Sequence, residues 1–90
     1  MVKWTEDSSE YDRVRNLMLK IELGSQISFK LKNGKTLKGH VAGFGTGTDV
    51  GVNLESGRGA IVTSMWGEIR VRLEDGNVVV VDAVDVQNAS

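Results

Sequence analysis

The residue types that most often do chemistry in enzymes are scarce in this chain of 90 residues. It has one histidine, His40, and no cysteine, so neither a thiolate metal site nor a cysteine nucleophile can form. The glycine-rich stretch "GFGTGTDVG" lacks the Lys-Ser/Thr ending of a phosphate loop and the spacing of a dinucleotide fingerprint. The sequence therefore predicts a protein that is not an enzyme, with no catalytic residue, no metal site and no cofactor. For His40 it predicts a plain surface or interface role.

Binding to an anionic partner has more support, because the positive charges gather in one segment. Residues 13–40 carry seven basic side chains and one acidic side chain, although the whole chain has a net charge of −1. Four of the lysines surround one predicted turn: Lys30, Lys32, Lys35 and Lys38. A localised basic surface can steer an anionic partner such as RNA. The alternative is a solvated face that only keeps the protein in solution.

One helix is predicted ahead of these lysines, at about residues 9–23. Ser9 and Asp12 resemble a capping box at its start, and Gly24 is a natural stop at its end. The apolar residues of this segment recur at helical spacing and form one stripe: Tyr11, Val14, Leu17, Met18 and Ile21.

The rest of the chain alternates apolar and polar residues as strands do. Asn33-Gly34 and Asp75-Gly76 are strong hairpin signals. In the glycine-rich insert at 43–67, "DVGVNLE" and "GAIVTSM" predict two short strands, and the glycines suggest mobile connections.

Gly39 stands in the middle of a predicted strand, where a glycine has no side chain to pack. A small barrel closes only when its long strands bend sharply, and interior glycines allow such bends. We therefore expect a mostly β fold, in which an N-terminal α-helix precedes a strongly bent, five-stranded, antiparallel SH3-like barrel. The barrel would occupy about residues 26–88, and residues 1–90 would form a single domain.

These residues resemble the Sm-like family, which includes the Sm, LSm and Hfq-type proteins. In that family a helix precedes a motif whose positions are matched here by Ile27, Phe29, Leu31, Asn33, Gly34, Leu37, Gly39, Val41 and Phe44. The family's Asp-x-x-apolar-Asn-Leu element is matched by "DVGVNL". The second half departs from the pattern, since "IRV" has the arginine without the following glycine and "VDAVDV" stands where the bacterial proteins have Tyr-Lys-His.

The resemblance implies an Sm-like barrel that forms rings and binds single-stranded RNA. Carried over residue by residue, it nominates Asn53 and Arg70 for recognition of a base, with Asp49 orienting them. Phe44 has the family's aromatic position and would stack on an unpaired base. Simpler roles remain open: core packing for Phe44, a turn for Asn53, and a cross-strand carboxylate partner for Arg70.

The segment "VVVVDAV" predicts self-assembly, because it is apolar on both faces and a free edge of that kind aggregates unless it is paired. Pairing it with the next subunit would give a closed homo-oligomeric ring of roughly five to seven subunits. The candidate interface residues are Val78, Val79, Val80 and Val81. A central strand of a monomeric barrel is the alternative. Trp4 and Trp66 are further candidates for interface or core.

Two functions therefore stand side by side. The first is a ring-forming Sm-like chaperone or scaffold that binds single-stranded RNA. The second is an oligomeric SH3-like adaptor that binds protein and not RNA. The N-terminus lacks an apolar run and no segment approaches the length of a membrane span, so we expect no membrane partner and a cytoplasmic location.

Overall fold

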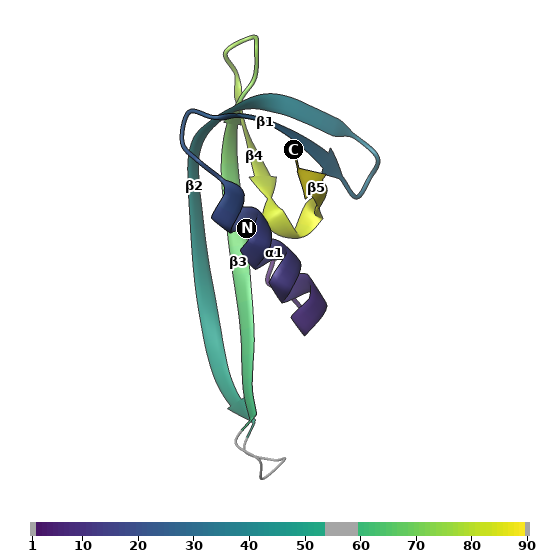
Figure 1. The fold of residues 1–90 in the computed structure, drawn as a ribbon, viewed down its shortest axis with the longest axis vertical. Coiled ribbons are helices and arrows are strands. Elements are labelled where there is room, and N and C mark those ends of the chain that lie inside the picture. The colour runs from purple at the N-terminus through teal and green to yellow at the C-terminus, as the bar shows by residue number, and fades with distance from the viewer. Residues whose placement is uncertain (1, 54–59, 90) are drawn as a thin grey trace.

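The structure is a computed structural model that describes residues 2–53 and 60–89, with the side chains of residues 49–53 and 60–63 left out of that description. Within these residues one helix precedes five antiparallel strands, which lie in the order β4-β3-β2-β1-β5 (Figure 1). The elements are α1 (Ser8–Lys20), β1 (Gln26–Leu31), β2 (Thr36–Asn53), β3 (Ala60–Arg72), β4 (Val78–Asp82), the 3-10 turn η1 (Ala83–Asp85) and β5 (Val86–Ala89). The predicted mostly β fold, with an N-terminal helix and a bent five-stranded antiparallel sheet, is confirmed.

The helix begins and ends earlier than predicted. Asp7 is the N-cap, since its Oδ1 accepts a hydrogen bond from the backbone N–H of Glu10 at 2.7 Å. The predicted cap at Ser9 is therefore wrong. The helix ends at Lys20 because the chain must already turn toward the sheet, where the N–H of Gly24 donates to the carbonyl of Val41 at 2.8 Å. Gly24 adopts φ +79° in that turn and not at the helix end itself.

The core lies between α1 and the concave face of the sheet. Val14, Leu17 and Met18 of α1 are buried there. The strands contribute fully buried side chains, among them Phe29, Ile69 and Val71. On β3, Gly67 is buried because α1 passes so close that a Cβ at this position would lie 2.7 Å from Met18 Sδ and 2.9 Å from Ala83 Cβ. Helix and sheet are thus packed with no space between them at Gly67.

The bend predicted at Gly39 is present in β2. Residues of β2 up to His40 pair with β1, and those from His40 onward pair with β3. A Cβ at Gly39 would collide with the carbonyl oxygen of Arg72, so the change of partner requires glycine here. A register shift between Val41 and Gly43 adds to the bend.

Beyond the bend, β2 and β3 continue together as a two-stranded arm that extends away from the body (Figure 1). Its pairing is unbroken from Phe44 opposite Ile69 to Asn53 opposite Ala60. The prediction of two short strands and mobile connections in this region is wrong for the described residues. The glycines at alternate positions stay within β2, and side chains of β3 lie over Gly43, Gly45 and Gly47. Leu54 and Glu55 of the predicted strand lie outside the described residues.

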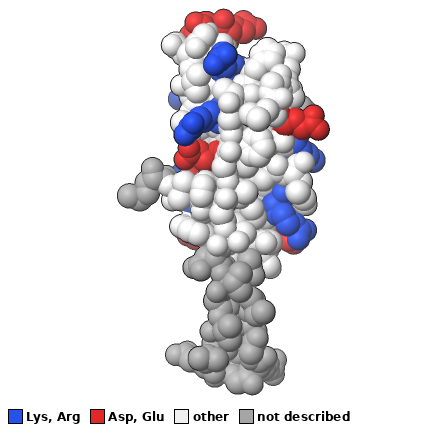
Figure 2. All heavy atoms as spheres, turned by 90° about the vertical axis from the view of Figure 1, so that its left-hand side faces the viewer, with Lys and Arg blue, Asp and Glu red and all other residues white. Residues whose placement is uncertain are grey.

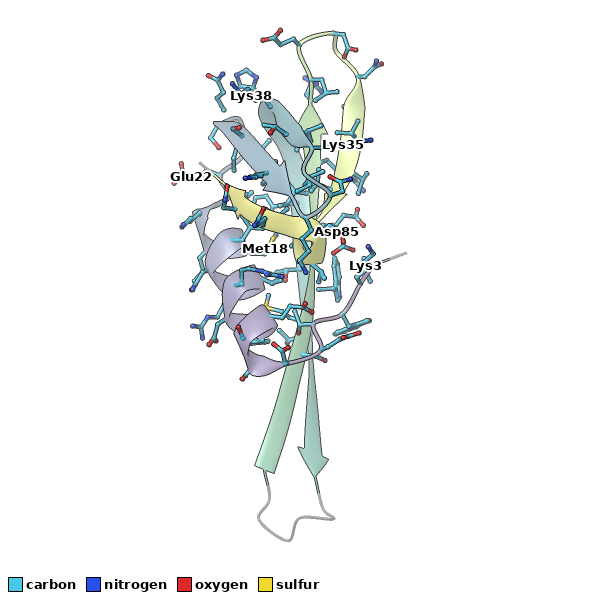
Figure 3. All side chains as sticks on the ribbon, turned by 90° about the vertical axis from the view of Figure 1, so that its right-hand side faces the viewer. Lys3, Met18, Glu22, Lys35, Lys38 and Asp85 are labelled. Atoms are coloured by element: carbon cyan, nitrogen blue, oxygen red, sulfur yellow. The ribbon has the colours of Figure 1, made fainter. Side chains whose placement is uncertain are left out.

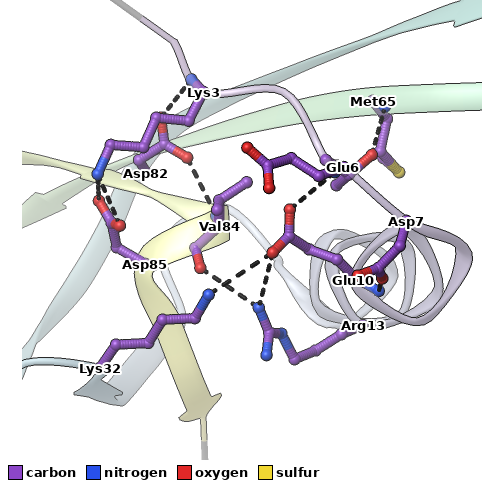
Figure 4. A network of polar contacts seen from close by, with 11 residues as sticks. Lys3, Glu6, Asp7, Glu10, Arg13, Lys32, Met65, Asp82, Val84 and Asp85 are labelled. Carbon is purple, nitrogen blue, oxygen red and sulfur yellow. Dashed lines mark hydrogen bonds and ion pairs between the residues drawn. The ribbon is translucent and has the colours of Figure 1, made fainter.

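The N-terminal segment that precedes α1 is bonded to β3 and to η1 (Figure 4). The N–H of Thr5 donates to the carbonyl of Met65 at 2.9 Å, and the N–H of Met65 donates to Thr5 Oγ1 at 3.0 Å. Lys3 Nζ donates to both carboxylate oxygens of Asp85 at 2.8 Å. In the described part of the chain, no helix has the length and apolar character that crossing a bilayer requires.

Candidate nucleic-acid interface

The outward side of the sheet carries a row of basic residues contributed by three neighbouring strands. We call this the outer face and define it by Lys30, Lys38, His40, Arg70 and Arg72, all of which are exposed. The strand register brings them together, because His40 pairs directly with Arg72. Lys38 pairs with Ser28 and Lys30 with Thr36 on the adjacent hairpin, while the alternate residues point inward to the core.

The four lysines predicted as one cluster are not in one place. Lys30 and Lys38 lie on the outer face. Lys35 lies in the connection between β1 and β2, where its N–H donates to Asn33 Oδ1 at 3.0 Å. Figure 3 shows Lys35 and Lys38 well apart. Lys32 turns toward the helix, and its Nζ lies 3.7 Å from Glu10 Oε2.

Lys32 belongs to a polar network around the start of α1 (Figure 4). Glu10 Oε2 is also 3.8 Å from an Arg13 guanidinium nitrogen, which donates to the carbonyl of Val84 at 3.4 Å. The second oxygen of Glu10 accepts from the N–H of Glu6 at 3.0 Å. Because its charge is partly neutralised there, Lys32 is the least suited of the four lysines to contact an outside anion.

Arg70 and Arg72 are the arginines of the outer face. Each is exposed, and among the described side chains neither makes an ion pair with a carboxylate. The carboxylate partner considered for Arg70 is therefore not found in that part of the chain. Arg70 pairs with Gly43 on one side and with Val80 on the other. A Cβ on Gly43 would lie 3.7 Å from Arg70 Cδ, so the arginine rests on the bare backbone of β2.

The other residues nominated for base recognition do not gather around Arg70. Phe44 pairs with the buried Ile69 and so lies on the opposite side of the sheet from Arg70, although it is 45% exposed. The backbones of Asp49 and Asn53 pair with those of Ser64 and Ala60. At about 3.3 Å per residue they lie roughly 20 and 33 Å along the arm from Gly43. Their side chains are outside the described residues.

Sequence reasoning did not nominate Arg72 as a site residue. Alternation alone places it outward, as it does Arg70, but only the register brings it beside His40 and Lys38. That register depends on how the two strands of the arm align, which the glycine-rich sequence does not reveal.

The outer face ends in an apolar strip and an acidic turn. Val78 and Val80 of β4 are 48% and 61% exposed, and they pair with Arg72 and Arg70. Val79 and Val81 point inward to the core, so only two of the four predicted interface valines present side chains outward. Figure 2 shows basic and acidic side chains interspersed over one side of the body, with a further group of acidic ones at the end that bears the β3–β4 turn. That turn carries the exposed Glu74 and Asp75.

The sheet ends in two strands that each have one partner within the described chain. β4 pairs with β3 alone, and β5 pairs with β1 alone. Their outer edges therefore leave backbone N–H and C=O groups open to another strand. Among the described residues, no group of three His, Asp or Glu side chains is placed to hold a metal ion.

No protein family model and no curated protein sequence matches this chain. A solved structure does: XC5848 from Xanthomonas campestris, a protein whose crystal structure is described as adopting a novel variant of Sm-like motif. The two structures have a TM-score of 0.69 over 100% of this chain and 92% of XC5848, at 8% sequence identity. The chain has an Sm-like fold. The resemblance drawn from the Gly34, Leu37 and Gly39 spacing is thus confirmed at the level of the fold.

Proposed function

We propose that this protein is a ring-forming, Sm-like protein that binds single-stranded RNA through its outer face. The observation that carries the proposal is the alignment of Lys30, Lys38, His40, Arg72 and Arg70 across three strands. Side chains in such a row can follow the phosphates of one extended strand, and neutralising phosphates supplies most of the affinity of non-specific binding. A protein that binds RNA in this way would act as a chaperone or scaffold for RNA, and it would not be an enzyme.

Ring assembly multiplies this surface. The free edges of β4 and β5 belong to the same subunit, so the β4 edge of one copy can pair with the β5 edge of the next. Repeating that contact closes a ring of roughly five to seven subunits and leaves no edge open. Every subunit would add its own outer face, and a strand of RNA would meet several of them at once.

The experiment is fluorescence anisotropy of labelled oligo-U and oligo-A at two salt concentrations. We expect affinity to fall with salt, by a slope of about 0.7 in log K for each phosphate contact on a single strand. Lys38→Ala and Arg72→Ala should each weaken binding and lower that slope. Lys20→Ala removes one exposed lysine from α1, away from the outer face, and should change neither. Equal effects of all three substitutions, or no binding, would refute the proposal.

A protein-binding adaptor is the second candidate, and one observation favours it. Leu19 and Leu23, at the C-terminal end of α1 and just beyond it, are 77% and 68% exposed. Large apolar side chains that are this exposed are suited to contact another protein. If oligonucleotides do not bind while Leu19→Lys disrupts capture of a specific protein partner, the adaptor function replaces RNA binding.

A further inference from the structure

The arm carries a feature that RNA binding on the body does not use. Trp66 of β3 is half-buried, and its indole lies across the backbone of β2 at Gly47. A Cβ at Gly47 would collide with Trp66 Nε1 and lie 2.9 Å from Cε2. At Gly45 a Cβ would lie 3.6 Å from Cη2 of the same ring. The ring therefore packs directly on a strip of glycine backbone.

Gly43, Gly45 and Gly47 form one row along β2, which we call the glycine row. Arg70 rests over its first member and Trp66 over the other two. Since side chains alternate along a strand, Trp66, Glu68, Arg70 and Arg72 all point to the same side of β3. The flat indole thus lies on the same side of the sheet as the outer face, about 13 Å along the strand from Arg70.

This arrangement has the two parts of a site for single strands: an aromatic surface and adjacent positive charge. The glycine row covers the indole on one side, and Trp66 keeps part of its surface exposed for a ligand. Thr46 holds this part of β3 in place, because its Oγ1 donates to the carbonyl of Trp66 at 2.7 Å. A ring that packs on the glycine row loses little freedom when a base stacks on it.

We propose that Trp66 is a stacking platform for one unpaired base of an RNA strand that continues from the outer face onto the arm. The proposal rests on the function proposed above and adds a binding position to it. Glu68, half-buried between Trp66 and Arg70, repels phosphate, so the backbone is held at Arg70 and Arg72 while a base reaches the indole. The Glu68 carboxylate also accepts hydrogen bonds from base amino groups, as acidic side chains do with cytosine. Oligo-C therefore binds this position better than oligo-U.

The test uses the full chain carrying Trp4→Phe, in which Trp66 is the only tryptophan. Labelled oligo-C and oligo-U are titrated, with anisotropy reporting binding and indole emission reporting the environment of Trp66. We expect the emission of Trp66 to be quenched in proportion to binding. Trp66→Leu keeps an apolar side chain on the glycine row and should weaken oligo-C binding about 5- to 160-fold, the range expected for losing one stacked base.

Several outcomes would overturn the proposal. In the Trp4→Phe protein, an anisotropy change on binding without any change of Trp66 emission would contradict the platform. So would an unchanged affinity of Trp66→Leu. Both results would leave RNA binding by the outer face intact. Equal quenching by a double-stranded RNA would also exclude stacking, because paired bases cannot reach the ring. The absence of any anisotropy change would refute both the platform and the proposed function. Circular dichroism of Trp66→Leu establishes that a lost affinity is not a lost fold.

Discussion

Met18 of α1 and Gly67 of β3 touch so closely that the position of a Cβ on the glycine lies 2.7 Å from the methionine sulfur. Both residues are buried, and Ala83 Cβ closes the other side at 2.9 Å. The contact fixes how far the helix stands from the sheet. It explains why a glycine occurs in the middle of a core-facing strand, where it otherwise weakens the strand.

Gly67→Ala should destabilise the protein, because an added methyl group forces the helix away from the sheet. Overpacking of this kind typically costs about 1–3 kcal/mol. The free energy of unfolding in urea measures it. Gly43→Ala is the matched control, since its Cβ would meet only Arg70 Cδ at 3.7 Å. A Gly67→Ala protein as stable as the Gly43→Ala protein would mean that helix and sheet are not in contact there.

The helix cap can be tested with two neighbouring residues. Asp7→Ala removes the acceptor for the N–H of Glu10 and should cost about 1 kcal/mol. Ser9→Ala lies inside the first turn and should change the free energy of unfolding by much less. Chemical denaturation of the two variants decides between the caps, and the opposite order of stabilities would restore Ser9 as the N-cap.

Assembly through the β4 edge predicts a specific effect of Val80→Lys. The side chain is 61% exposed in the single subunit, so lysine fits there without loss of the fold. Beside a neighbouring strand, however, the charge of the lysine would be buried, which carries a desolvation cost that is absent in the single subunit. Native mass spectrometry should show the assembly replaced by single chains. Leu19→Lys changes an even more exposed apolar residue on α1 and should leave the assembly intact. An unchanged assembly in Val80→Lys would contradict edge pairing.

The ion pair of Lys3 with Asp85 gives the N-terminal segment a dependence on alkaline pH. The carboxylate of Asp85 accepts a hydrogen bond from Lys3 and raises the pKa of the lysine above its ordinary value. Because the folded-state pKa is raised, the stabilisation is fully present below the ordinary pKa of about 10.4 and is lost as pH rises through the folded value. Lys3→Met should therefore have a slightly lower Tm than the unsubstituted protein at pH 9, and the difference should vanish at strongly alkaline pH. Lys20→Met is the control. A difference that persists at strongly alkaline pH would assign the effect to packing.

The sequence was sufficient for the features that depend on local chemistry. The two hairpin turns are where Asn33-Gly34 and Asp75-Gly76 predict them, with φ +87° at Gly34 and +89° at Gly76. The bend at Gly39 could also be predicted locally, from a glycine within a strand pattern. The reason that a glycine is needed there is the carbonyl of Arg72, which is far along the chain. The helix was identified by its apolar stripe, and only its ends were misplaced, since caps depend on single side chains.

The arm and the arrangement of the site could not be predicted in the same way. In "GFGTG" the apolar contacts of the glycine row are supplied by Trp66 and Arg70 of the partner strand, so β2 by itself shows no strand pattern. Unless the arm is predicted, the register of β2 against β3 is unknown, and Arg72 cannot be placed beside His40. For the same reason Phe44 and Arg70 looked like members of one pocket, although they lie on opposite sides of the sheet.

The glycine row also restricts the errors that two long, weakly patterned strands can make when they meet. If β3 slid by one residue along β2, Trp66 would oppose Thr46 or Thr48, whose side chains leave no flat backbone for the indole. A slip by two residues would keep the faces correct but would carry Arg70 or Trp66 past the end of the row and away from the irregularity at Val41 and Gly43. The alternating glycines give β2 no apolar pattern of its own, but they select one alignment of β3 along β2 out of many. In this hairpin the glycines of β2 therefore favour the correct strand register during folding.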